Sequence, residues 1–197
     1  MEPRKAEITR NTKETRINIK LDLDSSEKPE INTGLPFFDH ILYSMSFHGG
    51  FFLRVDASGD IEVDPHHLVE DTGLVLGDAF KSAAEKGEAL VRFGHAIIPM
   101  DDSLAEATID ACGRPFLVYR AEYPQENAGT FYVFLLKEFL KAFSDRAGLN
   151  LHLECRYGEN SHHMAEALFK SMGKALGQAY KQASNGEVLS TKGTLSK

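Results

Sequence analysis

Hydrophobic and polar residues alternate with two different periods along this chain, and the two periods predict a mixture of strands and helices. In the segment Arg16–Leu23, isoleucine or leucine occupies every second position, which is typical of a strand with one buried face. Apolar residues recur at helical spacing in Pro36–Phe47, and Gly49–Gly50 ends that helix. Short apolar runs predict further strands at Phe51–Ala57, His95–Met100, Ala105–Ala111, Pro115–Arg120 and Leu149–Tyr157. Further helices are expected from about Asp64 to Gly87, from Thr130 to Arg146 and from Ser161 to Ala183, with a turn at Ser25–Glu30 and a loop at Tyr123–Gly129.

A His-His-x-x-Glu motif occurs twice, and each copy opens a long helical stretch. The first copy is His66, His67 and Glu70, and the second is His162, His163 and Glu166. The helical segments that precede the motifs correspond as well, which makes His40 and Glu138 repeat partners. We therefore predict an α+β fold that is internally duplicated, with two sheet-plus-two-helix halves packed about a pseudo-twofold axis. The halves are residues 1–87 and 88–197, the second with a C-terminal tail, and we expect them to form one compact unit.

The spacing within the motif suits metal binding. On a helix the first His and the Glu share a face, whereas the second His points about 100° away, so that one His pair can serve two metal ions. Imidazole nitrogen and carboxylate oxygen together are ligands for zinc, manganese, iron or nickel. A solvated helix start is the alternative for a single copy, and two copies in matching contexts favour the metal site.

Composition and charge narrow the class of protein. With 42% apolar and 26% charged residues, the chain can bury a substantial core, and the two cysteines are too few for a disulfide framework. No apolar run approaches the roughly 18 residues that a membrane span needs, so we expect a soluble, cytoplasmic protein without a membrane partner. A formal charge of −7 argues against nucleic-acid binding, although a local group of Arg and Lys could still bind a small anionic substrate.

Several motifs, in the same order along nearly the whole chain, resemble the imidazoleglycerol-phosphate dehydratase family of histidine biosynthesis. They are Thr12–Thr15 around Glu14, Pro36–His40 with His48–Gly49, Asp64–Asp71, Gly113–Pro115, Asn160–Glu166 with Phe169–Lys170, and Ser190–Gly193. The family's bifunctional versions carry an extra phosphatase domain, for which this chain is too short. The resemblance therefore implies the monofunctional form.

The resemblance implies the sixth step of histidine biosynthesis, in which D-erythro-imidazole-glycerol phosphate loses water to give imidazole-acetol phosphate. Two manganese ions (Mn2+) per active site would hold the substrate's ring, and the family's assembly implies a homo-oligomer of 24 subunits with active sites shared between subunits. The implied metal ligands are His40, His66, His67, Glu70, Glu138, His162, His163 and Glu166, with Glu138 standing where many members have His. The implied substrate-binding residues are Glu14, His40, His48, Arg92, Arg114, His162, Lys170, Ser190, Thr191 and Lys192.

The chemistry explains why such residues would be needed. The carbon-bound hydrogen that must be removed is barely acidic, so metal ions would draw electrons from the ring while Glu14 acts as the catalytic base. Arg and Lys would bind the phosphate. Asp39, Asp71 and Asp101 could accept hydrogen bonds from ligand imidazoles or could serve in turns and caps.

Simpler interpretations of these residues stay open from the sequence. Glu14 could be a surface carboxylate, each cation could be an ordinary surface charge, and the tail Ser184–Lys197 could be disordered or could close over a phosphate. Two other functions also stay open. One is a dinuclear metallohydrolase, and the other is a metal-storage or structural protein that binds metal without turnover.

Overall fold

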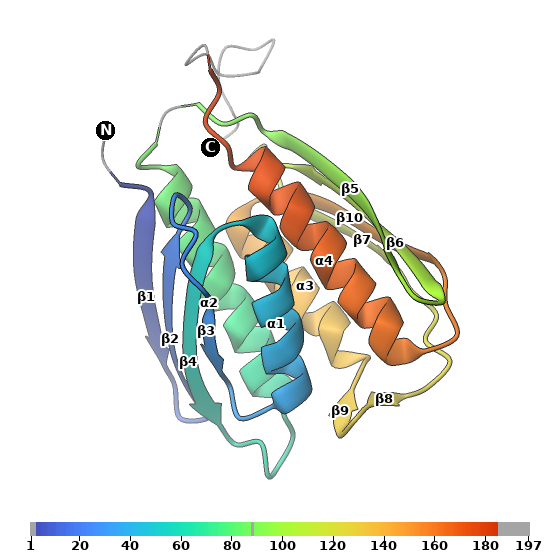
Figure 1. Ribbon diagram of the computed structural model, residues 1–197. Helices are drawn as coiled ribbons and strands as arrows, with labels where there is room; N and C mark the ends of the chain where they lie inside the picture. Colours follow the sequence, from blue (N-terminus) through green and yellow to red (C-terminus); the bar gives the residue numbers. More distant parts are fainter. Residues whose placement is uncertain (1–2, 88, 185–197) are drawn as a thin grey trace.

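Two sheets enclose a layer of helices (Figure 1). The computed structural model describes residues 3–87 and 89–184. Within them, each of the two large sheets has four strands, a short hairpin forms a separate two-stranded sheet, and the layer between the large sheets has four helices. The first half contains β1 (Lys5–Asn11), β2 (Thr15–Asp22), β3 (Glu30–Asn32), α1 (Pro36–Gly49), β4 (Phe52–Gly59) and α2 (His66–Ala84). The second half contains β5 (Phe93–Met100), β6 (Ser103–Asp110), β7 (Phe116–Arg120), the short β8 (Asn127–Ala128) and β9 (Phe131–Tyr132), α3 (Leu135–Ala147), β10 (Asn150–Tyr157) and α4 (Ser161–Ala179).

The two sheets have the same topology. Their strand orders are β1-β2-β4-β3 and β5-β6-β10-β7. In the first sheet, β2 pairs antiparallel with β1 and β4, and the short β3 pairs parallel with β4. In the second sheet, β6 pairs antiparallel with β5 and β10, and the short β7 pairs parallel with β10. The prediction of a duplicated α+β fold is confirmed.

Local signals at helix ends are duplicated too. Helices α1 and α3 both end at a glycine in the left-handed region, Gly50 with φ 72° and Gly148 with φ 68°. One turn earlier, the hydroxyl of Ser46 donates to the carbonyl of Phe51 at 2.6 Å, and that of Ser144 donates to the carbonyl of Leu149 at 2.8 Å. The same short segment therefore turns the chain from helix into strand in both halves.

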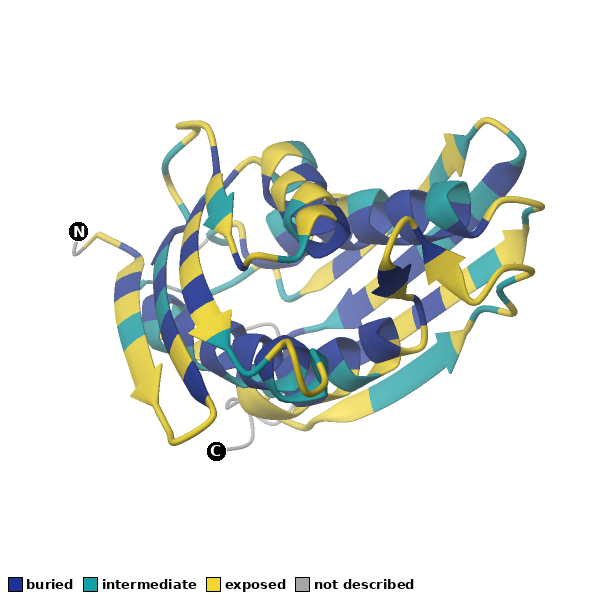
Figure 2. Ribbon diagram, turned by 90° about the horizontal axis from the view of Figure 1, so that it is seen from below, coloured by how far each residue is buried: buried dark blue, intermediate teal, exposed yellow. Residues whose placement is uncertain are grey.

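The helices pair across the halves, α1 with α4 and α2 with α3. A glycine permits the close approach in each pair, because a Cβ on Gly173 would lie 2.1 Å from the carbonyl oxygen of Met45 and one on Gly77 would lie 2.8 Å from that of Phe143. Figure 2 shows buried residues on the helices and on alternate positions of the strands. A single buried cluster includes residues of both halves, among them the fully buried rings of Phe38, Phe80, Phe139, Phe143 and Phe169.

Three expectations about elements are wrong. The sequence predicts neither β1 nor β3. In β1 only Ala6 is buried, so the apolar alternation is too weak to detect, and β3 begins at Glu30, where the turn was expected to end. The expected helix start at Thr130 is instead the turn between β8 and β9, and α3 begins at Leu135. Helix α4 ends at Ala179 rather than Ala183. No helix of the described residues is long and apolar enough to cross a membrane.

Candidate metal centre

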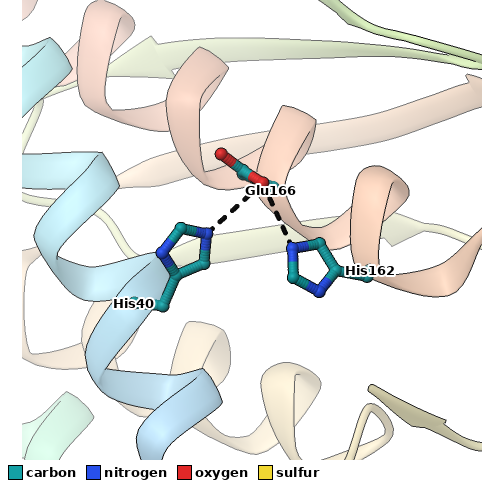
Figure 3. Close-up of side chains that lie close together, drawn as sticks. All are labelled: His40, His162 and Glu166. Carbon is teal, nitrogen blue, oxygen red and sulfur yellow. Dashed lines mark ion pairs between the residues drawn. The ribbon is translucent and has the colours of Figure 1, made fainter. Parts of the chain in front are cut away.

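Three predicted ligands from two helices come together at the surface. The Nε2 atoms of His40, on α1, and His162, on α4, each lie 3.3 Å from Oε2 of Glu166 (Figure 3). In the part of the chain that the structure describes, this is the one group of three or more potential ligand side chains whose donor atoms all lie within 4.8 Å of one another. Glu166 is buried, whereas the two imidazoles remain 46% and 44% exposed, so the group is accessible to a metal ion.

The start of α4 is held firmly, which fixes where His162 points. The side chain of Asn160 accepts a hydrogen bond from the backbone N–H of His162 at 2.9 Å. The side chain of Gln125 accepts another from the backbone N–H of Ser161 at 2.7 Å. In the first half, Oδ1 of Asp64 accepts from the backbone N–H of His66 at 2.8 Å, although the N-cap residue of α2 is Pro65. In both motifs, the side chain two residues before the first His thus accepts from the backbone N–H of that His.

Glu166 is ionised at neutral pH. Burial, the largest influence, raises the pKa of Glu166, but hydrogen bonds from Lys170 and His40 outweigh it and the pKa lies below its usual value. The ammonium of Lys170 lies 2.8 Å from Oε1 of Glu166. Two imidazoles and an ionised carboxylate are a donor set that fits a divalent transition metal, and manganese is among the ions that accept it.

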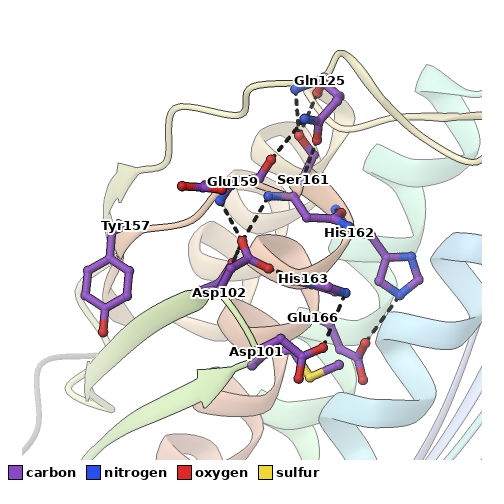
Figure 4. Close-up of polar contacts among 12 residues, drawn as sticks. Asp101, Asp102, Gln125, Tyr157, Glu159, Ser161, His162, His163 and Glu166 are labelled. Atoms are coloured by element: carbon purple, nitrogen blue, oxygen red, sulfur yellow. Dashed lines mark hydrogen bonds and ion pairs between the residues drawn. The ribbon is translucent and has the colours of Figure 1, made fainter.

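The second His of each motif is hydrogen-bonded to an aspartate. Nδ1 of His163 lies 2.5 Å from Oδ1 of Asp102, and Nδ1 of His67 lies 3.3 Å from Oδ2 of Asp60. Figure 4 shows Asp102 between His163 and the segment that precedes α4, where the backbone N–H groups of Glu159 and Asn160 donate to it. The hydrogen bond from His163 is the main cause that lowers the pKa of Asp102, and the one to Asp60 is the main cause that raises the pKa of His67. Each ring therefore has its Nδ1 engaged, which leaves Nε2 as the atom that could bind metal; Nε2 of His163 lies 3.6 Å from Oδ2 of Asp101.

The first motif forms no complete centre within the chain. Nε2 of His66 lies 3.7 Å from Oε2 of Glu70. Glu138 is half-buried on α3, and it joins no group of three ligands among the described residues. The structure therefore brings together three of the eight predicted ligands, and the roles of the other five stay predictions.

Glu14 lies at the tip of the β1–β2 hairpin, close to His67. Its backbone N–H donates to Oγ1 of Thr12 at 3.1 Å, and its carbonyl accepts from the backbone N–H of Asp60 at 3.2 Å. The side chain is exposed on a hollow of about 630 Å³ that residues 11–16 line together with Ser58 and Gly59. The charge of the Glu14 carboxylate also raises the pKa of His67, so the two groups interact through space without a hydrogen bond.

The predicted phosphate-binding residues are spread over the molecule. Burial is the largest cause that lowers the pKa of His48, and the charges of Lys170 and Lys174 lower it further, so these groups are neighbours. Arg92 instead pairs with Asp110 at 2.6 Å. Its backbone contacts Ala179, about 20 Å along α4 from Glu166 at 1.5 Å per residue.

The other predicted site residues lie away from the group around Glu166, lie outside the described residues, or have other partners. Arg114 is exposed after β6, and its carbonyl accepts from Nδ2 of Asn150 at 2.9 Å. Ser190, Thr191 and Lys192 lie outside the described residues. Of the three aspartates considered as partners of ligand imidazoles, Asp101 lies 3.6 Å from Nε2 of His163. The other two have different roles, because Asp39 binds Thr33 and Asp71 binds Thr15 and Arg10. The sequence analysis missed Asp60 and Asp102, which only the pairing of strands brings to the motifs.

Comparison with known proteins identifies the family. A model of the family described as imidazoleglycerol-phosphate dehydratase matches residues 33–176. The chain is 49% identical over 193 residues to the imidazoleglycerol-phosphate dehydratase of Trichlorobacter lovleyi, covering 98% of this chain and 99% of that protein, and 46% identical to that of Phenylobacterium zucineum, covering 98% and 99%. The crystal structure of the Staphylococcus aureus enzyme matches with a TM-score of 0.83 and 35% identity, covering 91% of this chain and 99% of that one. That of the Pyrococcus furiosus enzyme matches with a TM-score of 0.83 and 37% identity, covering 95% and 100%. The chain therefore belongs to the imidazoleglycerol-phosphate dehydratase family and is a hydro-lyase of histidine biosynthesis.

Proposed function

We propose that this protein removes water from D-erythro-imidazole-glycerol phosphate to give imidazole-acetol phosphate, using two Mn2+ ions per active site to hold the substrate's ring. The observation that carries the proposal is the group formed by His40, His162 and Glu166, because it joins the two halves of the duplication in one metal-type donor set. Its exposed imidazoles leave room for a ring from solvent.

The chemistry assigns a task to Glu14. The product carries its ketone on the middle carbon, so the hydroxyl that leaves is the one beside the ring, and the hydrogen ion that leaves comes from the next carbon. Loss of both gives an enol, which becomes the ketone. When bound, metal ions would supply Lewis acidity that favours loss of the proton from a ring nitrogen, so that the electron-rich ring helps the neighbouring hydroxyl to leave. Glu14 accepts the carbon-bound hydrogen ion, because its carboxylate is exposed beside the imidazole of His67.

The substrate's phosphate needs positive groups beyond the metals. Lys170 is suited to that task, since its ammonium lies 2.8 Å from Glu166. His48, whose pKa is lowered by burial and by the charges of Lys170 and Lys174, would contribute a neutral hydrogen-bond donor. Arg92 is about 20 Å along α4 from Glu166, so it does not reach a substrate at the same chain's His40–His162–Glu166 group. We propose that Arg92 binds phosphate in the site of a neighbouring subunit, together with Arg114, Ser190, Thr191 and Lys192.

A shared site also explains why one chain holds an incomplete centre. His66 and Glu70 lie on α2, which pairs with α3 rather than with α4, and they do not join the group around Glu166. We propose that a complete two-metal site combines the group around Glu166 in one subunit with the first motif of a neighbour. An assembly of 24 subunits in the cytoplasm, as the family resemblance implies, would supply such neighbours.

The reaction is tested with D-erythro-imidazole-glycerol phosphate and purified protein. We expect an enolisable ketone to appear without free phosphate, and we expect Glu14→Gln to lower kcat by about 10²–10⁴-fold. Release of inorganic phosphate would instead indicate a metallohydrolase. Metal binding without turnover would indicate a storage or structural protein, and either result would contradict the proposal.

Shared sites are tested by complementation between two inactive variants. His66→Ala and His162→Ala should each be inactive alone. The two variants are co-expressed, and mixed particles are purified by two different tags. With random mixing in a symmetric assembly, about a quarter of the sites should combine the intact group around Glu166 from one variant with the intact first motif from the other. No recovery of activity in the mixed particles would show that each site is complete within one chain.

A further inference from the structure

The strand register makes Glu14 and Asp102 equivalent positions of the two repeats. In the first sheet Lys5 pairs with Asp22, and in the second Phe93 pairs with Asp110, so the same pairing recurs 88 residues later. Continued to the hairpin tips, this register matches Glu14 with Asp102. Each repeat therefore presents a carboxylate from its first hairpin to the second His of its own motif.

The two equivalent carboxylates have different partners. Oδ1 of Asp102 binds Nδ1 of His163 at 2.5 Å, and Oδ2 accepts from the backbone N–H groups of Glu159 at 2.6 Å and Asn160 at 3.0 Å. Asp102 thus ties the imidazole ring to the start of α4 (Figure 4). In contrast, no hydrogen bond or ion pair within residues 3–87 and 89–184 engages the carboxylate of Glu14.

In the first half, another residue takes the place beside the ring. Asp60 follows β4 and accepts from Nδ1 of His67 at 3.3 Å. The β-bulge between Cys155 and Tyr157 shifts the register by one residue, so the second-half counterpart of Asp60 is Glu159. Gly158 corresponds to Gly59, because Gly59 lies against Thr15 and Leu68 and Gly158 lies against the equivalent Ser103 and Met164. Glu159 donates its backbone N–H to Oδ2 of Asp102 at 2.6 Å, and the hairpin carboxylate of Asp102 is the one that holds His163.

We infer that Asp60 and Asp102 are positioning residues that hold His67 and His163 with Nε2 directed to a metal ion. In the first half Asp60 holds the ring in place of the hairpin carboxylate, so Glu14 remains available for proton transfer. The inference rests on the proposed metal sites. A carboxylate that accepts from Nδ1–H fixes the tautomer and the ring orientation, and loss of such a partner lowers metal affinity by about 10–100-fold.

The test measures Mn2+ binding to the metal-free, full-length protein, using the electron paramagnetic resonance signal of free Mn2+. Asp60→Asn and Asp102→Asn should each weaken one class of site by about 10–100-fold. Glu14→Gln should lower kcat by about 10²–10⁴-fold and leave Mn2+ affinity within about twofold of the wild type, because that carboxylate holds no ligand ring.

Gln125→Ala is the matched control for a purely structural role of Asp102. Gln125 accepts from the backbone N–H of Ser161 at 2.7 Å and donates to the carbonyl of Glu159 at 3.0 Å, so it holds the same helix start without contacting His163. This variant should lose thermal stability and weaken Mn2+ binding by less than Asp102→Asn does, because it removes no partner of a ligand ring. If Asp102→Asn behaves as Gln125→Ala does, or if Glu14→Gln weakens Mn2+ binding as much as Asp102→Asn, the inference is overturned. A wild-type protein that binds no Mn2+ would instead overturn the proposed function.

Discussion

Substitution of Gly173 by alanine should separate the two helices that form the metal-type group. A Cβ at this position would lie 2.1 Å from the carbonyl oxygen of Met45 and 3.1 Å from its Cα, so the neighbour is backbone that cannot rotate away. An ordinary contact needs about 1 Å more, and overpacking of this kind typically costs about 1–3 kcal/mol. For a chain of this size that corresponds to a fall in Tm of roughly 2–12 °C.

The same displacement acts on the site, because Met45 and His40 share α1 whereas Gly173 and Glu166 share α4. If α1 moves by about 1 Å, the His40–Glu166 distance grows from 3.3 Å to about 4.3 Å. Misplacement by 1 Å can cost about 10²-fold in rate. Gly173→Ala should therefore lose Mn2+ affinity and activity in addition to stability.

Thermal unfolding, Mn2+ titration of the metal-free protein and the dehydration assay together test this reasoning. Leu53→Ala provides the control, since Leu53 is fully buried on β4 and its truncation leaves a cavity that costs about 2–5 kcal/mol without driving α1 from α4. Equal Tm losses with wild-type metal affinity in both variants would show that α1–α4 spacing does not set the geometry of the group.

Three further predictions concern pH, charge and metal. Burial raises the pKa of Tyr119 and Tyr123, whose hydroxyls lie 2.6 Å apart. The neutral phenols therefore stabilise the fold below about pH 10, and this contribution should be lost as the pH rises further. Urea unfolding should show less of that loss in Tyr119→Phe. Lys170→Met should raise KM for the phosphate substrate by about tenfold or more, because a charge-assisted hydrogen bond is lost, and an unchanged KM would exclude Lys170 from phosphate binding. Chelation should abolish activity and loosen the assembly, with Mn2+ restoring both; a particle unchanged in size by light scattering would contradict the second part.

The repeat explains how much of the fold could be predicted. The strand at Arg16–Leu23 and the motif helices carry strong periodicity, so their place and type were predicted, although the two helices end three and four residues earlier than expected. The strand β1 lies at the edge of its sheet and buries only Ala6, so no alternation marks it. Phe131 and Val133 are buried on alternate positions before α3 begins, a two-residue period that was mistaken for the start of the helix.

The site was harder to predict than its ligands. The types and spacing of His162 and Glu166 indicate metal binding within one helix, but the place of His40 beside them depends on α1 crossing to the second half's helix. Likewise Asp60 and Asp102 have no spacing that marks them as partners of imidazoles. Their positions follow from strand register, which a linear pattern does not contain.

The helix pairing also bears on the unusual carboxylate at Glu138. Gly77 lies against Phe143 on α3 as Gly173 lies against Met45 on α1, so the two helix pairs share one register, and Glu138 stands toward the first motif as His40 stands toward the second. The pairings differ in charge, however. His40 lies 3.3 Å from the carboxylate of Glu166, which attracts its ring, whereas the shared register predicts that Glu138 faces Glu70, and two carboxylates repel each other. A divalent cation removes that repulsion. We therefore expect Glu70 and Glu138 to come close together only when a cation binds between them. The group of His40, His162 and Glu166, in contrast, already comes together through its own ion pairs.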